Sequence, residues 1–328
     1  MRAQRLLEPG QPLVLQDVPR PDPGPDAIRV AVRCCGVCHT DLHVVEGDLP
    51  DPRLPLIPGH EIVGTVEAVG AHVTRFQVGD RVGIPWLHET DQTCTYCRQG
   101  QENLCGAARF TGYTADGGYA EYTTVPAEYA VPIPERFADE EAAPLLCAGI
   151  VGYRSIRLSD LQRGERLGIY GFGASGHIVI QVARHWDCEV FVFTRSAEHK
   201  QHAHALGAAW VGEATDEPPA LLDRAICFAP AGWIVPLALG HLRKGGTLCI
   251  IAIHTSPIPE MPYALLWHER TVRTVANATR RDAEEFMPLA ASIPIHTDIQ
   301  TFDLDAANHV LGLLKGSRIN GAAVLKVR

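Results

Sequence analysis

Three closely spaced cysteines raise the question of metal binding in this chain. The segment TDQTCTYCRQGQENLC, residues 90–105, contains Cys94 and Cys97 as a C-x-x-C pair, and Cys105 follows after seven intervening residues. Such spacing is typical of a zinc knuckle, but a closed structural zinc site needs four ligands. The pattern therefore predicts either an empty lobe with free thiols or a site completed by a residue other than cysteine.

A second set of potential metal ligands is divided among CCGVCHTDLH (34–43), GHEIVG (59–64) and LLCAGI (145–150). The first segment contains another C-x-x-C pair, Cys35 and Cys38. A thioredoxin-like redox pair is the alternative, but such a pair normally opens a helix in a small redox domain. GHEIVG has no second histidine four residues after the first, so it does not match the metalloprotease helix motif.

The segment YGFGASG predicts a site for a dinucleotide. It places Gly171, Gly173 and Gly176 in the order G-x-G-x-x-G, with Ala174 and Ser175 completing the loop. The loop follows the apolar strand RLGIY and opens the apolar helix SGHIVIQVARHW, which is the context that the motif requires. The glycines permit a tight turn, close approach of a pyrophosphate and close helix–strand packing. A glycine turn in an ordinary α/β domain is the alternative.

Two kinds of element must position these residues. Up to residue 148 the chain is rich in glycine, proline and short β-branched runs, and we expect strands at AIRVAVRCCGV, EIVGTVEAVG, DRVGI and AEYTTVP. Beyond residue 149, strands alternate with helices: EVFVFT, then the helix AEHKQHAHALG, then DRAICFA, the helix WIVPLALGHLRKGG and the strand TLCIIAI. This alternation predicts βαβ units on a parallel sheet. The tail contains the amphipathic helix LDAANHVLGLLKGS and the strand GAAVLKV.

Composition limits the possible functions. A chain of 328 residues is long enough for two domains, and its net charge of −9 argues against nucleic-acid or anionic-membrane partners. The N-terminal segment has no signal-peptide pattern and no apolar run approaches membrane-spanning length, so we expect a cytoplasmic protein. In such a protein the ten cysteines are better explained as metal ligands or buried small hydrophobes than as disulfides.

Together these segments resemble the zinc-dependent medium-chain alcohol dehydrogenases, close to the yeast-like and bacterial enzymes. The resemblance covers nearly the whole chain: VCHTDLH, PGHEIVGTVEAVG, GDRVGIPWL, GGYAEY, LLCAGI and the glycine loop. It implies an α/β protein with a loop-rich, mostly-β GroES-like catalytic domain (1–148 and 280–328) and a doubly wound Rossmann domain (149–279). The implied activity is reversible hydride transfer between a small alcohol and NAD(P), in a homodimer or homotetramer.

By this resemblance Cys38, His60 and Cys147 are the catalytic zinc ligands. Two thiolates and one imidazole leave the ion formally neutral with a fourth position open, where an alcohol becomes more acidic. Glu61 is expected to approach the zinc during ligand exchange. Asp41 is expected to fix His60 through its other ring nitrogen, with a turn cap as the alternative role.

The resemblance also implies a proton route and a substrate pocket. Thr40 takes the proton of the alcohol, which passes through a ribose hydroxyl of the cofactor to His43 and to solvent. His39 occupies the position of a pyrophosphate-binding cation. Trp86 and Leu49 match pocket-wall positions, and leucine in place of the tryptophan of many relatives predicts a roomier pocket.

Relatives complete the cysteine lobe with a fourth cysteine three residues before the first one here, and this chain has Asp91 at that position. A carboxylate is an acceptable zinc ligand. We therefore expect Asp91, Cys94, Cys97 and Cys105 to hold a structural zinc, which makes two zincs per chain. Rival fourth ligands are Glu89, His88 and Glu102. The remaining cysteines, 34, 35, 188, 227 and 249, lie in apolar segments and should be buried.

The cofactor is expected to be NADP(H), with NAD(H) possible. An NAD site needs an acidic residue at the end of the second strand, and here that position falls at Thr194. Arg195, Ser196 and Lys200 follow, and a guanidinium can bind the 2′-phosphate through two hydrogen bonds. The alternative is that Arg195 is a solvated loop residue. Val151 replaces a threonine that relatives often place against the nicotinamide.

Two other functions are compatible with the same elements. One is a zinc-free quinone or enone reductase of the same fold, but such enzymes lack the zinc cysteines. The other is a non-catalytic binding or storage protein, which the intact ligand set with Thr40 and His43 argues against.

Overall fold

The computed structural model describes residues 1–316, 318–319 and 321–328, and these form two compact units. The first unit consists of Met1–Cys147, Ala278–Ala291 and His296–Arg328, and the second of Ala148–Asn277 and Ser292–Ile295. Each unit has its own main sheet and its own hydrophobic core. The expected limits of the catalytic domain, 1–148 with 280–328, and of the Rossmann domain, 149–279, stay a prediction.

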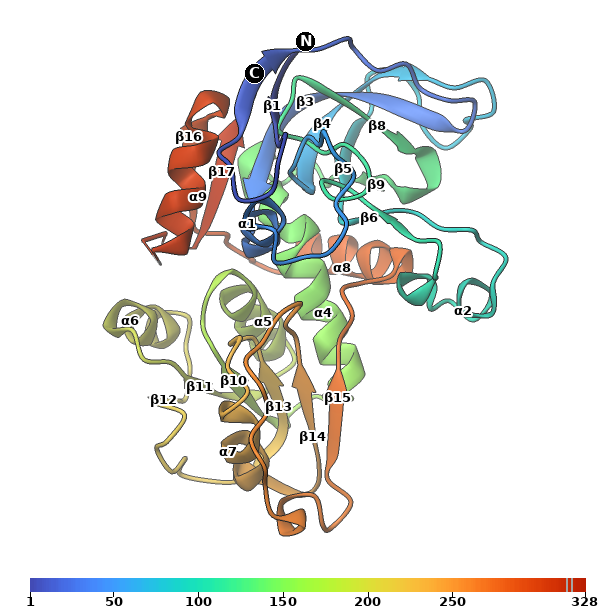
Figure 1. Ribbon diagram of the computed structural model, residues 1–328. Helices are drawn as coiled ribbons and strands as arrows, with labels where there is room; N and C mark the ends of the chain where they lie inside the picture. Colours follow the sequence, from blue (N-terminus) through green and yellow to red (C-terminus); the bar gives the residue numbers. More distant parts are fainter. Residues whose placement is uncertain (317, 320) are drawn as a thin grey trace. The chain divides into compact units, whose positions relative to one another are not determined.

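The first unit contains a seven-stranded sheet in the order β16-β17-β3-β4-β5-β9, with β8 also paired to β3 (Figure 1). The longest strand is β3, in which Ile28, Val30 and Val32 alternate into the core because successive side chains of a strand point to opposite faces. The strands of this sheet are β3 Ala27–Val37, β4 Glu61–Val69, β5 Arg81–Ile84, β8 Tyr122–Pro126, β9 Val131–Pro132, β16 Ile299–Asp303 and β17 Ala322–Lys326.

Smaller elements complete this unit. Two hairpin-like pairs are β1 Arg2–Arg5 with β2 Val14–Asp17, and β6 Leu87–Glu89 with β7 Arg109–Phe110. Its helices are α1 His39–Glu46, α2 Thr95–Arg98, α3 Asp139–Ala142, α8 Arg280–Ser292 and α9 Ala307–Lys315, with short 3-10 turns that include η1 Glu102–Leu104, η2 Ala127–Tyr129, η3 Ala143–Leu146 and η5 Leu304–Ala306.

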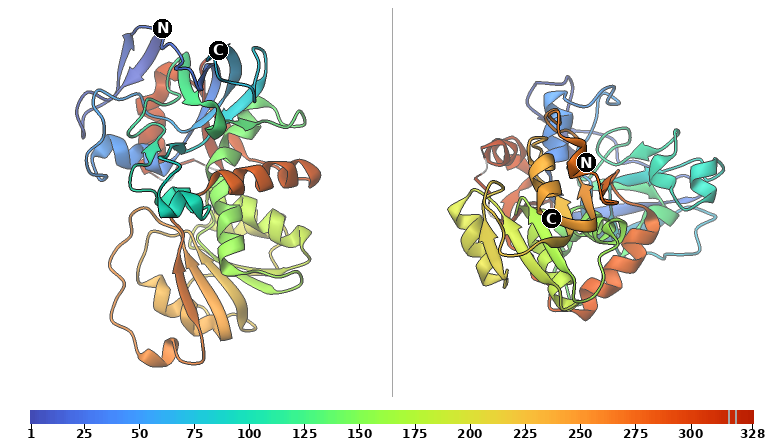
Figure 2. Two further views of the ribbon diagram at one scale, coloured as in Figure 1. Left: turned by 90° about the vertical axis from the view of Figure 1, so that its right-hand side faces the viewer. Right: turned by 90° about the horizontal axis from the view of Figure 1, so that it is seen from below.

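The second unit contains a fully parallel six-stranded sheet in the order β12-β11-β10-β13-β14-β15. Helices α4 and α5 pack on one face and α7 on the other (Figures 1 and 2). Because the strand order reverses between β10 and β13, their carboxyl ends form the place where such sheets bind ligands. The elements are α4 Ala148–Ser159, β10 Arg166–Tyr170, α5 Ala174–His185, β11 Glu189–Phe193, α6 Ala197–Ala205, β12 Trp210–Gly212, β13 Leu222–Cys227, α7 Ile234–His241, β14 Leu242–Ile250, η4 Tyr263–Leu265 and β15 Thr271–Thr274.

The predicted helix WIVPLALGHLRKGG is wrong in its second half. The helix ends at His241, and LRKGG belongs to β14. Pairing with β13 explains the difference, since Leu242 lies opposite Leu222 and a bulge follows before Thr247 lies opposite Arg224. Helices α1 and α8 are not among the predicted elements. Within the described part of the chain, no helix is both long and apolar enough to cross a bilayer.

Candidate metal centres and cofactor loop

The N-terminus of α1 fixes the first candidate zinc ligand. Cys38 is the N-cap residue, and its sulfur accepts the N–H of Thr40 at 3.5 Å. Asp41, three residues later, accepts the backbone N–H of Cys38 at 2.8 Å. The residues C-H-T-D thus form a capping box in which a sulfur takes the place of the usual hydroxyl oxygen.

Asp41 also contacts His60, the role expected for it from the sequence, with the cap as the alternative. Its Oδ1 lies 2.9 Å from Nδ1 of His60, while Oδ2 accepts a hydrogen bond from the hydroxyl of Tyr119 at 3.1 Å. Asp41 and His60 are fully buried. One carboxylate therefore caps the helix and orients the imidazole at the same time.

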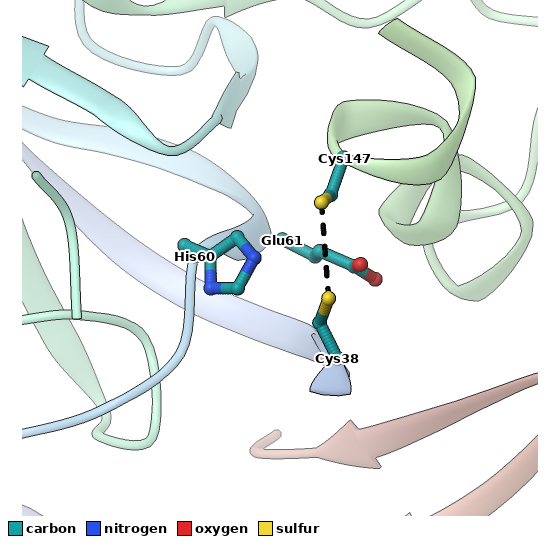
Figure 3. A group of neighbouring side chains, drawn as sticks. All are labelled: Cys38, His60, Glu61 and Cys147. Carbon is teal, nitrogen blue, oxygen red and sulfur yellow. Dashed lines mark hydrogen bonds between the residues drawn. The ribbon is translucent and has the colours of Figure 1, made fainter. Parts of the chain in front are cut away.

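Three side chains, of His60, Glu61 and Cys147, gather around the sulfur of Cys38. The potential ligand atoms of Cys38, His60, Glu61 and Cys147 all lie within 4.8 Å of one another, and the two sulfurs are 3.9 Å apart. Figure 3 shows His60 on one side of the line between the sulfurs and the Glu61 carboxylate on the other. Nε2 of His60 is buried and has no hydrogen-bond partner among the described residues. A cation held by this nitrogen and the two sulfurs would remove the cost of that unsatisfied atom, so the donor set fits zinc.

Local packing explains why this cluster can form. His60 follows Gly59, whose φ of 96° is in the left-handed region, and a Cβ on Gly59 would lie 2.4 Å from the Tyr119 ring. Glu61 begins β4, and a Cβ on the facing Gly36 would lie 1.8 Å from its Oε2. Cys147 follows directly after η3. The glycines at 36 and 59 therefore leave the space that Glu61 and Tyr119 occupy.

Electrostatics in the cluster favour an anionic sulfur. A hydrogen bond with Cys147 lowers the pKa of the Cys38 thiol well below its ordinary value, against the effect of burial. Burial, and then the charge of Cys38, raise the pKa of Glu61 well above its usual range. Burial acts to lower the pKa of His60, but the Asp41 carboxylate outweighs it and raises that pKa. A thiolate beside an oriented imidazole is suitable for binding a cation.

An aromatic group lies against the cluster. The rings of Trp86 and His60 meet edge-on, with their centroids 4.9 Å apart. The Trp86 ring also stacks on the rings of Phe110 and Tyr113, at centroid distances of 5.2 and 5.9 Å. Leu49 is partly buried against the core of the same unit. The structure thus brings Trp86 next to the candidate ligands, while the pocket-wall roles of Trp86 and Leu49 stay predictions.

The predicted relay residues lie on α1. Oγ1 of Thr40 is 3.8 Å from the sulfur of Cys38, and His43 follows three residues later on the same side of the helix. Nδ1 of His43 is 2.8 Å from Oδ2 of Asp48. His39 is exposed at the first helical position.

The second cluster contains the predicted lobe residues Asp91, Cys94, Cys97 and Cys105, whose potential ligand atoms also lie within 4.8 Å of one another. Oδ1 of Asp91 accepts the backbone N–H groups of Thr93 and Cys94 at 2.8 and 2.9 Å, and these bonds lower the pKa of the carboxyl well below its usual range. An ionised carboxylate beside three sulfurs fits a closed zinc site.

The three rival fourth ligands lie outside this group. Glu89 pairs with Arg109 at 3.0 Å. Glu102 is buried and accepts the backbone N–H of Arg280 at 3.0 Å, at the start of α8. His88 is buried on β6. The five cysteines expected to be small hydrophobes are all buried: Cys34, Cys35, Cys188, Cys227 and Cys249.

The glycine loop connects β10 to α5 at the reversal of strand order. Gly171 has a φ of 89°, and a Cβ on Gly176 would lie 2.8 Å from the carbonyl oxygen of Gly171. A Cβ on Gly173, the N-cap of α5, would meet no protein atom within 4 Å. The first and third glycines are thus required by the chain itself, whereas the second leaves open space at a helix N-terminus. That arrangement fits a pyrophosphate.

Comparisons with known proteins agree with this geometry. Residues 24–135 match the family model of the alcohol dehydrogenase GroES-like domain, and residues 174–292 match that of the zinc-binding dehydrogenases. The Mycobacterium tuberculosis (strain CDC 1551 / Oshkosh) protein named "Probable alcohol dehydrogenase AdhA" is 48% identical over 100% of this chain and 97% of its own length. The chain belongs to the zinc-dependent medium-chain alcohol dehydrogenase family.

Solved structures of alcohol dehydrogenases also resemble this family member. The enzyme of the hyperthermophilic archaeon Aeropyrum pernix has a TM-score of 0.89 at 30% identity, with 100% of both chains covered. The cobalt- and zinc-bound thermostable enzyme of Pyrobaculum aerophilum has a TM-score of 0.91 at 25% identity, with 100% of this chain and 99% of that chain covered. The expected α/β fold, with a GroES-like domain and a Rossmann sheet, is confirmed.

In this alcohol dehydrogenase the residues after β11 have distinct surroundings. Arg195 is exposed, and no hydrogen bond or ion pair involves it in the described part of the chain. Ser196 caps α6: its hydroxyl accepts the N–H of His199 and contacts the Glu198 carboxylate at 2.6 Å. Nζ of Lys200 is 3.1 Å from the carboxylate of Glu213. Ser196 and Lys200 thus already have protein partners, whereas the Arg195 guanidinium has none in the described part of the chain.

Two residues that contact the predicted site residues Asp41 and His43 are not predicted from the sequence: Tyr119 and Asp48. Tyr119 belongs to the quoted GGYAEY segment, but nothing in that segment shows that its hydroxyl reaches Asp41, 78 residues away. Asp48 follows the helix-ending Gly47, and a glycine–aspartate pair one turn after a histidine is the only sequence signal for its contact with His43.

Proposed function

We propose that this alcohol dehydrogenase carries out its reaction at the cluster of Cys38, His60 and Cys147, with zinc as the metal and the nicotinamide cofactor bound at the glycine loop. The observation that carries the proposal is the buried, unpartnered Nε2 of His60 beside two sulfurs, with Nδ1 held by Asp41. A buried nitrogen without a hydrogen bond is costly, and here a cation shared with the two sulfurs would remove that cost.

Each residue around the cluster has its own role in the proposed oxidation of an alcohol. When bound, zinc supplies a Lewis acid that makes the hydroxyl of an alcohol more acidic. Asp41 holds His60 in the tautomer that leaves Nε2 free for the metal. Trp86 covers one side of His60 and excludes water there. Thr40 accepts the proton of the alcohol, and His43 delivers it towards solvent.

Metal analysis combined with cofactor reduction tests this proposal. Purified protein should contain zinc and reduce NAD(P) only when an alcohol is added. Cys147→Ser should lose the zinc of this cluster and nearly all turnover, while Cys227→Ser, at a buried cysteine of the parallel sheet, should keep both. Full turnover in a Cys147→Ser protein that lacks this zinc would refute the assignment.

The same experiment separates the alternative functions. A zinc-free quinone or enone reductase would oxidise NAD(P)H with an enone and would not depend on Cys38 or Cys147. A non-catalytic binding protein would retain zinc without turnover. The gathered ligand set argues against the first, and Thr40 beside Cys38, with His43 one turn later on the same helix, argues against the second.

We further propose that the Asp91, Cys94, Cys97 and Cys105 cluster holds a second, structural zinc. The support is the mutual proximity of the four ligand atoms and the backbone hydrogen bonds that fix Asp91.

We also propose that NADP(H) is the preferred cofactor, because Arg195 is exposed beside the second strand and carries no competing ion pair among the described residues. His39, Thr194 and Ser196 remain candidate cofactor contacts.

The enzyme is proposed to act as a homodimer or homotetramer. Strand β15 is the terminal strand of the parallel sheet, and its four residues are exposed. Two exposed aromatic residues, Tyr263 at 69% and Trp267 at 55%, lie just before it in the chain. An exposed edge strand is a template for pairing with a second copy. Light scattering should show an oligomer, and Val272→Asp on β15 should weaken it.

A further inference from the structure

The C-terminus of α1 turns the chain back towards His43. Gly47 has a φ of 82° and donates its N–H to the carbonyl of Val44, while the next N–H, of Asp48, bonds to the carbonyl of His43 at 2.9 Å. This is a Schellman motif, in which a glycine in the left-handed conformation allows the N–H of the following residue to bond to the carbonyl at the start of the last helical turn. The backbone of Asp48 is therefore fixed beside the residue that carries the proposed relay base.

The side chains of Asp48 and His43 are also in contact. Oδ2 of Asp48 lies 2.8 Å from Nδ1 of His43, and the side chains are 43% and 23% exposed, respectively. A carboxylate at this distance accepts a hydrogen bond from the Nδ1–H group, and in this tautomer Nε2 carries no proton and can act as an acceptor. The other acidic residue at this end of the helix, Glu46, is paired instead with Lys315 of α9.

We propose that Asp48 is a positioning residue for proton transfer, which holds His43 in the tautomer and orientation that present Nε2 as the proton acceptor. This inference rests on the proposed relay role of His43. No bond to substrate is involved: Asp48 acts only through the imidazole, as an orienting carboxylate does in other histidine-based proton transfers. Because both side chains are partly exposed, the effect should be moderate.

The test measures the first-turnover rate of cofactor reduction in the zinc-loaded enzyme with saturating alcohol. Asp48→Ala should slow it on the order of tenfold, and Asp48→Asn, which keeps an acceptor oxygen, should fall between Asp48→Ala and the natural enzyme. Added imidazole buffer should restore the rate, since an external base replaces the relay. Glu46→Gln is the matched control and should leave the rate unchanged.

A double-mutant cycle separates positioning from a structural effect. In a His43→Ala background, Asp48→Ala should cause no further loss. An equal loss in both backgrounds, no rescue by imidazole, or full activity of Asp48→Ala would each overturn the inference. If His43→Ala itself leaves the rate unchanged, the relay proposal fails first, and this outcome is distinguishable from a failure of Asp48 alone. Zinc content and thermal melting confirm that each variant is folded.

Discussion

The hydroxyl of Tyr119 donates a hydrogen bond to Asp41 at 3.1 Å, and the other oxygen of the same carboxylate is 2.9 Å from His60. Burial raises the pKa of Tyr119 well above its ordinary value, so the phenol stays protonated and can only donate to the carboxylate. Tyr119 thus supports, through Asp41, the orientation of the imidazole proposed to bind zinc, although it is not one of the four residues of that cluster.

Removal of this hydroxyl should weaken metal retention. Tyr119→Phe leaves Asp41 with one donor fewer, and outer partners of metal ligands typically contribute about 10- to 100-fold in affinity. We expect the catalytic zinc of Tyr119→Phe to transfer to a coloured chelator about tenfold faster. Tyr122→Phe, on β8, is the control. Identical release from Tyr119→Phe and the natural protein would show that the hydroxyl does not support the centre.

Asp91→Ala should remove one of two zincs and lower the melting temperature, because a structural metal contributes directly to folding. Atomic absorption per chain together with a thermal melt measures both effects. Glu89→Gln changes a nearby carboxylate that pairs with Arg109 and should retain two zincs. One zinc per chain in metal-replete natural protein would mean that this cluster is not a metal site.

Arg195→Ala should reduce kcat/KM for NADP by about 10- to 100-fold, as expected for the loss of charge-assisted hydrogen bonds to a phosphate. The value for NAD should change little, since NAD has no 2′-phosphate. Arg163→Ala removes an exposed guanidinium that is paired with Asp187, and it controls for net charge. A natural enzyme that prefers NAD, or a loss that is equal for both cofactors, contradicts this role of Arg195.

His88 should make the stability depend on pH. Burial, with a contribution from Arg109, lowers the pKa of His88 to about 4, and its Nδ1 has no partner among the described residues. In the unfolded chain the pKa of histidine is about 6.5, so between these values the unfolded state binds more protons. Stability from this group is therefore complete above about pH 6.5 and is lost as the pH falls towards 4.

The expected loss between pH 7 and pH 5 is about 2 kcal/mol of the free energy of unfolding. Chemical denaturation at pH 7 and pH 5 measures the change in the free energy of unfolding between these values. In His88→Leu this change should be smaller than in the natural protein by about the same amount. His72→Gln, at an exposed histidine, should keep the dependence of the natural protein. An unchanged dependence in His88→Leu would mean that His88 is not the titrating group.

The sequence by itself determined the features that depend on short spacings. The glycine loop between an apolar strand and an apolar helix and the C-x-x-C lobe are set by covalent geometry over a few residues. The same local logic predicted β3 and β10 with the bounds that the structure has. It also led to the correct family, because several such motifs occur in one order.

Only the tertiary structure decided which partner each polar side chain has. The lobe offers four oxygen or nitrogen ligands within 15 residues of one another, and spacing alone does not choose among them. In the structure Glu102 accepts a hydrogen bond from Arg280, 178 residues away, and Asp91 lies close to the three cysteines. The helix predicted through LRKGG is likewise replaced by a strand, because these residues belong to β14, which pairs with β13. Such choices depend on which distant elements pack together, because a buried polar group takes whatever partner the fold brings within hydrogen-bonding distance.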